Sequence, residues 1–161
     1  MKEPYGVALF AALVLAGCGG DDGEVAICDA LTDPQVGEQI GADFQSRSDS
    51  GKALDGFRFE ECTWESPAGG KITVGVVSSA ARYTSIERAL RGAPGLERVD
   101  GVGDEAFTAS GFSSEERGGT GGRTVYIRDG ERTVLVALNP GEGETPPARV
   151  VGLAKDALDG L

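Results

Sequence analysis

The fold is decided by one hairpin, RTVYIRDGERTVLVALN, at residues 123–139. Its two halves flank the dipeptide Asp129-Gly130, which is typical of a two-residue turn between antiparallel strands. Residues 134–138 are apolar at every position, which predicts a central strand covered on both faces. The rest of the chain is therefore expected to build outward from an antiparallel sheet.

Further strands are expected on the N-terminal side of this hairpin. The stretches FRFEECTWES (57–66) and KITVGVVSS (71–79) flank a turn-forming PAGG segment. Ile72, Val74 and Val76 alternate with other residues, so one face of that strand should be buried. Another short strand is expected over residues 105–109. These runs predict an antiparallel sheet of about five strands.

Three helices are predicted around the sheet. Thr32 and Gln35 form a capping-box pattern at the start of a helix that Gly41 ends. Residues 80–92 form a second amphipathic helix. A third is expected to be capped by Thr145 with Pro146 at its first position. Its buried side chains are expected to be Val151, Ala154, Leu158 and Leu161.

The remaining polar stretches are expected to be loops. Residues 42–56 and 110–123 contain glycine and serine and show no apolar period, which predicts mobile connections. Runs of strands flanked by helices give an α+β class, with one domain over residues 25–161 and its helices packed against the sheet.

The N-terminus has the features of a lipoprotein signal. An apolar run of about ten residues is too short to cross a membrane but suits a signal peptide. It ends in Leu-Ala-Gly-Cys at residues 15–18, which resembles the bacterial lipobox. This resemblance implies cleavage after residue 17 and a lipid on the Cys18 sulfur, with residues 18–24 as a flexible tether. There are two weaker alternatives. In one, the protein is secreted without a lipid and Cys18 stands there by chance; in the other, the apolar run is a buried core helix.

Composition excludes several classes of partner and site. The formal net charge of −11 disfavours binding to nucleic acid or to anionic headgroups through a basic patch. With Cys18 lipidated, Cys28 and Cys62 remain as an even pair, for which a disulfide is the simple interpretation in an oxidising compartment. A metal pair is disfavoured because the chain has no histidine and no C-x-x-C. No cofactor is expected.

Three motifs resemble one lipoprotein family. They are CDALTDPQV at 28–36, CTW at 62–64 and GVGDEAF at 101–107. Their order and spacing are similar to the DUF3558 family of actinobacterial lipoproteins. The resemblance implies an envelope lipoprotein with a Cys28–Cys62 bridge and, more loosely, a fold of the Mog1/PsbP type. It implies no reaction.

Each motif also has a structural interpretation. Trp64 is expected to pack against the disulfide, and Gly101 and Gly103 are expected to serve turns with positive φ. Asp104 and Glu105 are neighbours on a strand and point to opposite faces, so they do not form a carboxylate pair. The run GGTGGR at 118–123 lacks the G-K-[ST] ending of a phosphate loop.

The function expected is non-catalytic. A chain without histidine has no Ser-His or Cys-His system, and no serine lies three residues before any lysine, as Ser-Lys chemistry requires. We expect a lipid-anchored binding or accessory module at the extracytoplasmic face of the membrane, holding an envelope protein or a small apolar molecule. The alternatives are a structural or assembly protein and, less favoured, a carboxylate-based envelope hydrolase. An apolar pocket of about 300 Å³ or more between sheet and helices would favour a small-molecule ligand.

Overall fold

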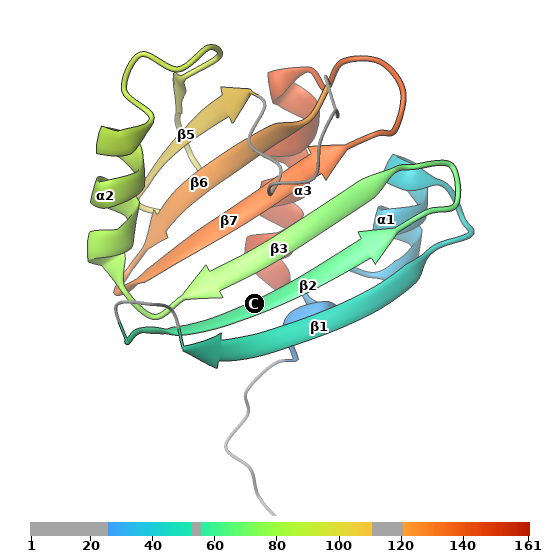
Figure 1. Ribbon diagram of the computed structural model, residues 1–161, viewed down its shortest axis with the longest axis horizontal. Coiled ribbons are helices and arrows are strands. Elements are labelled where there is room, and N and C mark those ends of the chain that lie inside the picture. The colour runs from blue at the N-terminus through green and yellow to red at the C-terminus, as the bar shows by residue number, and fades with distance from the viewer. Residues whose placement is uncertain (1–25, 53–55, 111–120) are drawn as a thin grey trace, which may run out of the picture.

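The computed structural model describes residues 26–52, 56–110 and 121–161. Within these ranges, seven strands form one antiparallel sheet with the order β1-β2-β3-β7-β6-β5-β4 (Figure 1). The strands are β1 (Gln45–Lys52), β2 (Arg58–Glu65), β3 (Lys71–Val77), β4 (Glu97–Val99), β5 (Glu105–Ser110), β6 (Arg123–Asp129) and β7 (Arg132–Asn139). The helices are η1 (Ile27–Asp29, a 3-10 turn), α1 (Asp33–Ile40), α2 (Ala80–Ala89) and α3 (Pro147–Gly160).

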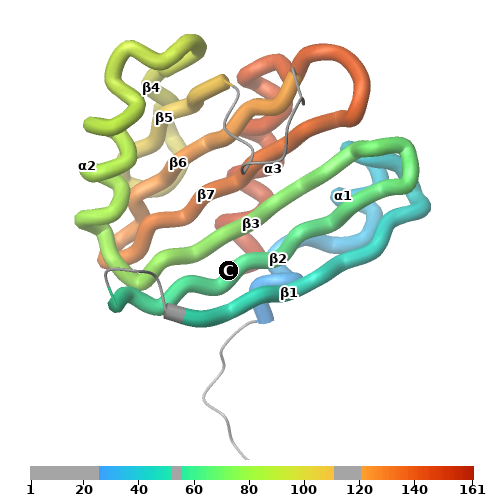
Figure 2. The backbone as a smooth tube through the Cα atoms, in the orientation of Figure 1, coloured from blue at the N-terminus to red at the C-terminus, as the bar shows by residue number. Residues whose placement is uncertain are grey.

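The α+β class and the central hairpin are confirmed. Strand β7 is the middle strand of the sheet and pairs with β3 on one side and β6 on the other. Its Val134, Val136 and Leu138 side chains are fully buried on one face. Leu135 packs on the opposite face with the cluster under α2. The prediction of about five strands is wrong, because β1 and β4 add two edge strands (Figure 2).

The larger core lies on the sheet face covered by η1, α1 and α3, which we call the core face. Cys62, Trp64, Ile72, Val74 and Val136 point to it from alternate strand positions. Figure 1 shows α3 passing behind the sheet in that view. Val36 and Ile40 of α1 and Val150 and Leu153 of α3 complete this core. Because Trp64 is buried beside Cys62, it is a packing residue, as predicted.

A smaller core lies on the other face beneath α2. The ring of Tyr83 in α2 packs at a tilt of 56° against Phe107 of β5, and the Phe107 ring stacks with Tyr126 of β6. The ring centroids are 5.3 Å and 5.1 Å apart, within the usual range for aromatic pairs. All three rings are buried. Helix α2 therefore covers the β5–β7 half of this face.

Local chemistry explains where α1 begins. The Gln35 side chain accepts hydrogen bonds from the backbone N–H and the hydroxyl of Thr32, each at 2.8 Å. This is the predicted capping box. Helix α1 ends before Gly41, whose φ of 94° favours glycine.

Helix α3 begins later than predicted. The residue before it is Pro146, and Pro147 is its first residue. Thr145 does not cap it, because the buried Thr145 hydroxyl donates instead to the Leu138 carbonyl of β7 at 3.3 Å. The buried side chains shift accordingly by about one residue from the predicted set. They are Val150, Leu153, Ala154 and Ala157, with Val151, Leu158 and Leu161 partly buried beside them.

Candidate functional site

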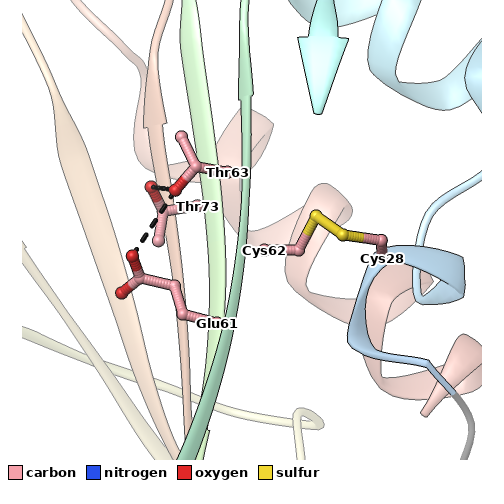
Figure 3. The surroundings of a disulfide bond; sticks show 5 residues. All are labelled: Cys28, Glu61, Cys62, Thr63 and Thr73. Atoms are coloured by element: carbon pink, nitrogen blue, oxygen red, sulfur yellow. Dashed lines mark hydrogen bonds between the residues drawn. A yellow bond between two sulfur atoms is a disulfide. The ribbon is translucent and has the colours of Figure 1, made fainter. Parts of the chain in front are cut away.

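The predicted site residues fall into two groups. Cys28 and Cys62 form a disulfide that joins η1 to β2, with their Cα atoms 5.1 Å apart (Figure 3). Cys62 is fully buried, so this bond fixes the N-terminal turn onto the core face. Cys18, the proposed lipid site, lies outside the described residues, as do residues 1–17.

The motif at 101–107 begins as a turn over residues 101–104 and continues into β5 from Glu105, as predicted. Gly101 and Gly103 have φ values of 72° and 56°. Asp104 fixes the neighbouring hairpin, because its N–H donates to the Arg128 carbonyl at 2.9 Å and its carboxylate accepts from the Gly130 N–H at 3.0 Å. The Glu105 carboxylate pairs instead with Arg128 at 3.1 Å. These two carboxylates therefore have separate structural partners.

The N-terminal half of the sheet presents a second, polar surface on the face opposite the core. No helix of the described ranges packs over β1–β3 there, since α2 covers the half formed by β5, β6 and β7. We call this surface the open face. The register places eight polar side chains on it: Gln45, Arg47, Asp49, Glu61, Thr63, Glu65, Lys71 and Thr73.

A directed chain of hydrogen bonds crosses the open face from β3 to β2. The Thr63 hydroxyl donates to Glu61 Oε1 at 3.5 Å and lies 3.3 Å from the Thr73 hydroxyl (Figure 3). A hydroxyl has one proton, so Thr73 is the donor in the second contact. Lone pairs on Thr73 and the carboxylate of Glu61 then remain as acceptors. This part of the face is suited to a ligand that donates hydrogen bonds.

Charged pairs border this chain. Lys71 Nζ lies 2.9 Å from Glu65 Oε1 and is its cross-strand neighbour. The hydrogen bond and positive charge of Lys71, with a smaller contribution from Arg47, lower the pKa of the Glu65 carboxyl below its usual value. Glu65 is therefore held ionised, which suits binding and disfavours a role as a general acid.

A cavity of about 520 Å³ adjoins the open face at the start of β1. Its walls include Asp43, Phe44, Arg47, Thr63, Glu65 and Pro67. A second cavity of about 300 Å³ lies on the core face beside the disulfide, between η1 and β1. Both lie at the β1–β2 side of the sheet, and apolar atoms form the larger part of the walls of each. The second cavity lies between η1 and the sheet and has the size that favours a small-molecule ligand.

Sequence reasoning missed the open face because it treated residues 42–56 as a loop. The structure forms β1 there and pairs Gln45 through Lys52 with β2. The available signal was the alternation around the 67–70 turn. Cys62 and Trp64 occupy one face and Thr63 the other, and Ile72 and Val74 mirror them around Thr73.

Other candidate sites are not supported within the described ranges. They contain no group of three or more cysteine, aspartate or glutamate side chains placed to hold a metal ion. None of their helices has the length and apolar character needed to cross a membrane. Residues 111–120, which include most of the predicted glycine-rich loop, lie outside these ranges.

Comparisons with known proteins leave the family open. No protein-family model matches the chain, and no curated protein matches it. Among solved structures, a GTP binding regulator from Thermotoga maritima is similar over 80% of this chain and 86% of that chain. The identity is 12% and the TM-score 0.43, so this likeness carries no argument about function.

Proposed function

We propose that this protein is a lipid-anchored binding module of the cell envelope. A lipid on Cys18 would hold it at the extracytoplasmic face of the membrane, and the open face would bind a segment of another envelope protein. Support for the anchor comes from the apolar N-terminal run that ends in Leu-Ala-Gly-Cys. The Cys28–Cys62 disulfide agrees with an oxidising compartment.

The observation that carries the binding proposal is the hydroxyl chain on the open face. Thr63 is only 4% exposed, yet its hydroxyl and that of Thr73 are directed toward Glu61. The remaining acceptors and the net charge of −11 favour a partner with backbone N–H, amide or basic groups. The contact with Lys71 lowers the pKa of Glu65, which disfavours that carboxyl as a general acid.

The proposal extends to family and fold type. The three motifs that resemble the DUF3558 family occupy connected parts of one structure. Leu31, Val36, Cys62, Trp64 and Ala106 belong to the same buried cluster. A seven-stranded antiparallel sheet with helices on both faces is also compatible with the looser Mog1/PsbP likeness.

Photocrosslinking in intact cells tests the binding proposal. A benzoylphenylalanine probe replaces Glu65 on the open face, and the control probe replaces Asp156, an exposed residue of α3. We expect a crosslinked partner from position 65 and none from position 156. A second Thr73→Val change, which removes the acceptor hydroxyl while keeping the side-chain shape, should reduce the yield. Equal products from both probe positions would contradict a partner on the open face.

A further inference from the structure

Strand β1 leaves a long edge of the sheet without a neighbour in the described chain. It pairs with β2 over eight consecutive residues with no break in register, so its backbone is regular along its length. Figure 1 shows it as the lower border of the sheet. An edge of this kind exposes N–H and C=O groups that can pair with another strand. The opposite edge strand, β4, has only three residues.

The side chains of β1 follow a simple pattern. Arg47 and Asp49 point to the open face, and Ser46, Ser48 and Ser50 point to the core face. All five are exposed. The strand contains no proline or bulge that would block pairing. The two charges, with small hydroxyl side chains between them, therefore determine which strand β1 accepts.

We infer that β1 pairs with β1 of a second copy of this chain, antiparallel and about a two-fold axis through Ser48. In that register Arg47 lies opposite Asp49 of the partner subunit, and Asp49 lies opposite the partner subunit's Arg47. Opposite charges facing each other across an antiparallel pair are favourable. On the other face only serines meet. The sequence of β1 is thus complementary to itself.

Neighbouring registers are disfavoured by the same charges. An axis through Arg47 would place it opposite Arg47 of the partner subunit, and an axis through Asp49 would oppose two carboxylates. Like charges directly opposite each other destabilise a strand pair. Among these three axes, only the one through Ser48 avoids such a contact. The charges therefore favour the register about Ser48, the one of these three that forms two Arg47–Asp49 pairs.

The geometry gives this pair an orientation. Ser48, Asp49 and Ser50 line the cavity of about 300 Å³ between η1 and β1. The axis of an antiparallel edge pair is perpendicular to the sheet, so both open faces and both N-terminal turns stay on matching sides. Two anchored copies could then reach the same membrane. This consequence rests on the proposed function, whereas the strand pairing itself does not.

The pair is expected to be weak in solution. One strand pair lies well below the area of a stable interface. Anchoring two chains in one membrane would raise their effective concentration and favour the pair. The test must therefore detect transient association.

Disulfide trapping provides such a test. The experiment uses the full chain with Cys18→Ala, so that the introduced cysteine carries the free thiol. R47C chains are mixed with D49C chains, which places the two thiols opposite each other and keeps the second Arg47–Asp49 pair. The control mixes R47C with Q45C, whose thiols would be about 14 Å apart along the strand. All three positions face away from the Cys28–Cys62 bond. We expect at least about tenfold faster trapping in the first mixture.

Charge reversal tests the register by sedimentation at high protein concentration. R47D alone or D49R alone should associate about tenfold more weakly than the parent chain, because each opposes like charges twice. A mixture of R47D with D49R chains, or the double variant, should restore association. Equal trapping in both thiol mixtures would overturn the proposal, as would single reversals that associate like the parent. Crosslinking of D49C only to a different envelope protein would also overturn it, in favour of a foreign strand.

Discussion

At the scale of single residues, Thr133 takes the place of a helix cap for α2. Ser79 precedes the helix but makes no capping hydrogen bond with its side chain. The Thr133 hydroxyl, from β7, accepts from the Tyr83 N–H at 2.9 Å and donates to the Ser79 carbonyl at 2.6 Å. Thr133 is 1% exposed, and the Tyr83 N–H depends on it, whereas the Ser79 carbonyl also accepts from the Arg82 N–H at 3.3 Å. This single side chain fixes α2 to the sheet.

Replacing Thr133 by valine should therefore destabilise the protein. Valine keeps the shape but leaves the buried Tyr83 N–H unpaired, which costs about 1–3 kcal/mol. Thr133→Ser keeps the hydroxyl and should retain most of that free energy of unfolding. Urea denaturation of both variants measures the difference. A valine variant as stable as the serine variant would show that the hydroxyl bridge contributes little.

Removing the hydroxyl of Tyr83 is expected to have the opposite effect on stability. Its ring is 1% exposed, and its hydroxyl has no hydrogen-bond partner among the described residues. Because burial of an unpaired hydroxyl is costly, Tyr83→Phe should leave stability unchanged or raise it slightly. Burial also raises the pKa of both Tyr83 and Tyr126 above the usual value.

The raised pKa values give a direction for alkaline unfolding. A phenol whose pKa is higher in the folded state contributes its full stability below its unfolded value of about 10. That contribution decreases as the pH rises through the folded value. Thermal melts from pH 8 to 11 should show stability falling above about pH 10. The fall should be smaller for Tyr83→Phe, and an equal fall would contradict the burial argument.

At the scale of elements, β1 shows where pattern-based prediction fails. Its side chains from Gln45 to Ser50 are polar and exposed on both faces, so it has no apolar alternation to indicate a strand. Its conformation comes from hydrogen bonding to β2, whose Cys62 and Trp64 are fixed on the core face. The capping box of α1 and the Asp129-Gly130 turn were predictable because their signals are local. The conformation of the edge strand β1 depends instead on its pairing with β2.

The disulfide is a covalent link between the N-terminal turn η1 and strand β2 of the sheet. It joins residues 34 apart, and the closed segment contains η1, α1 and β1. In the chain-entropy model, closing a loop of this length adds roughly 3–4 kcal/mol to the free energy of unfolding, because it restricts the unfolded chain. This contribution does not depend on the order of β1 in the folded state. Reduction should lower the melting temperature by several degrees. Hydrogen exchange should increase first in residues 26–44, and uniform loosening of the sheet would contradict this view.

At the scale of the whole molecule, the sequence predicted the α+β class, the central hairpin, the disulfide and the buried Trp64. Each depends on a local pattern or on the pairing of two cysteines. The strand order, the two edge strands and the open face were not predictable. They depend on which elements lie side by side across the sheet, and α2 covers only the β5–β7 half of one face. The candidate site is the part of that face that no helix of the described residues covers, so it is recognised only from the three-dimensional arrangement.

The position of the molecule in the cell rests on Cys18. A single acyl chain binds a membrane only marginally, whereas two chains hold a protein stably, so the proposed lipid modification should determine fractionation. Cys18→Ala should move the protein from the membrane fraction to the soluble fraction of lysed cells. The matched control is the Cys28→Ser/Cys62→Ser double variant, which loses two cysteines but keeps Cys18, and should stay with the membrane. If Cys18→Ala remained in the membrane after a high-salt wash, the lipid anchor would be wrong, and the apolar N-terminal run or a protein partner would have to account for the association.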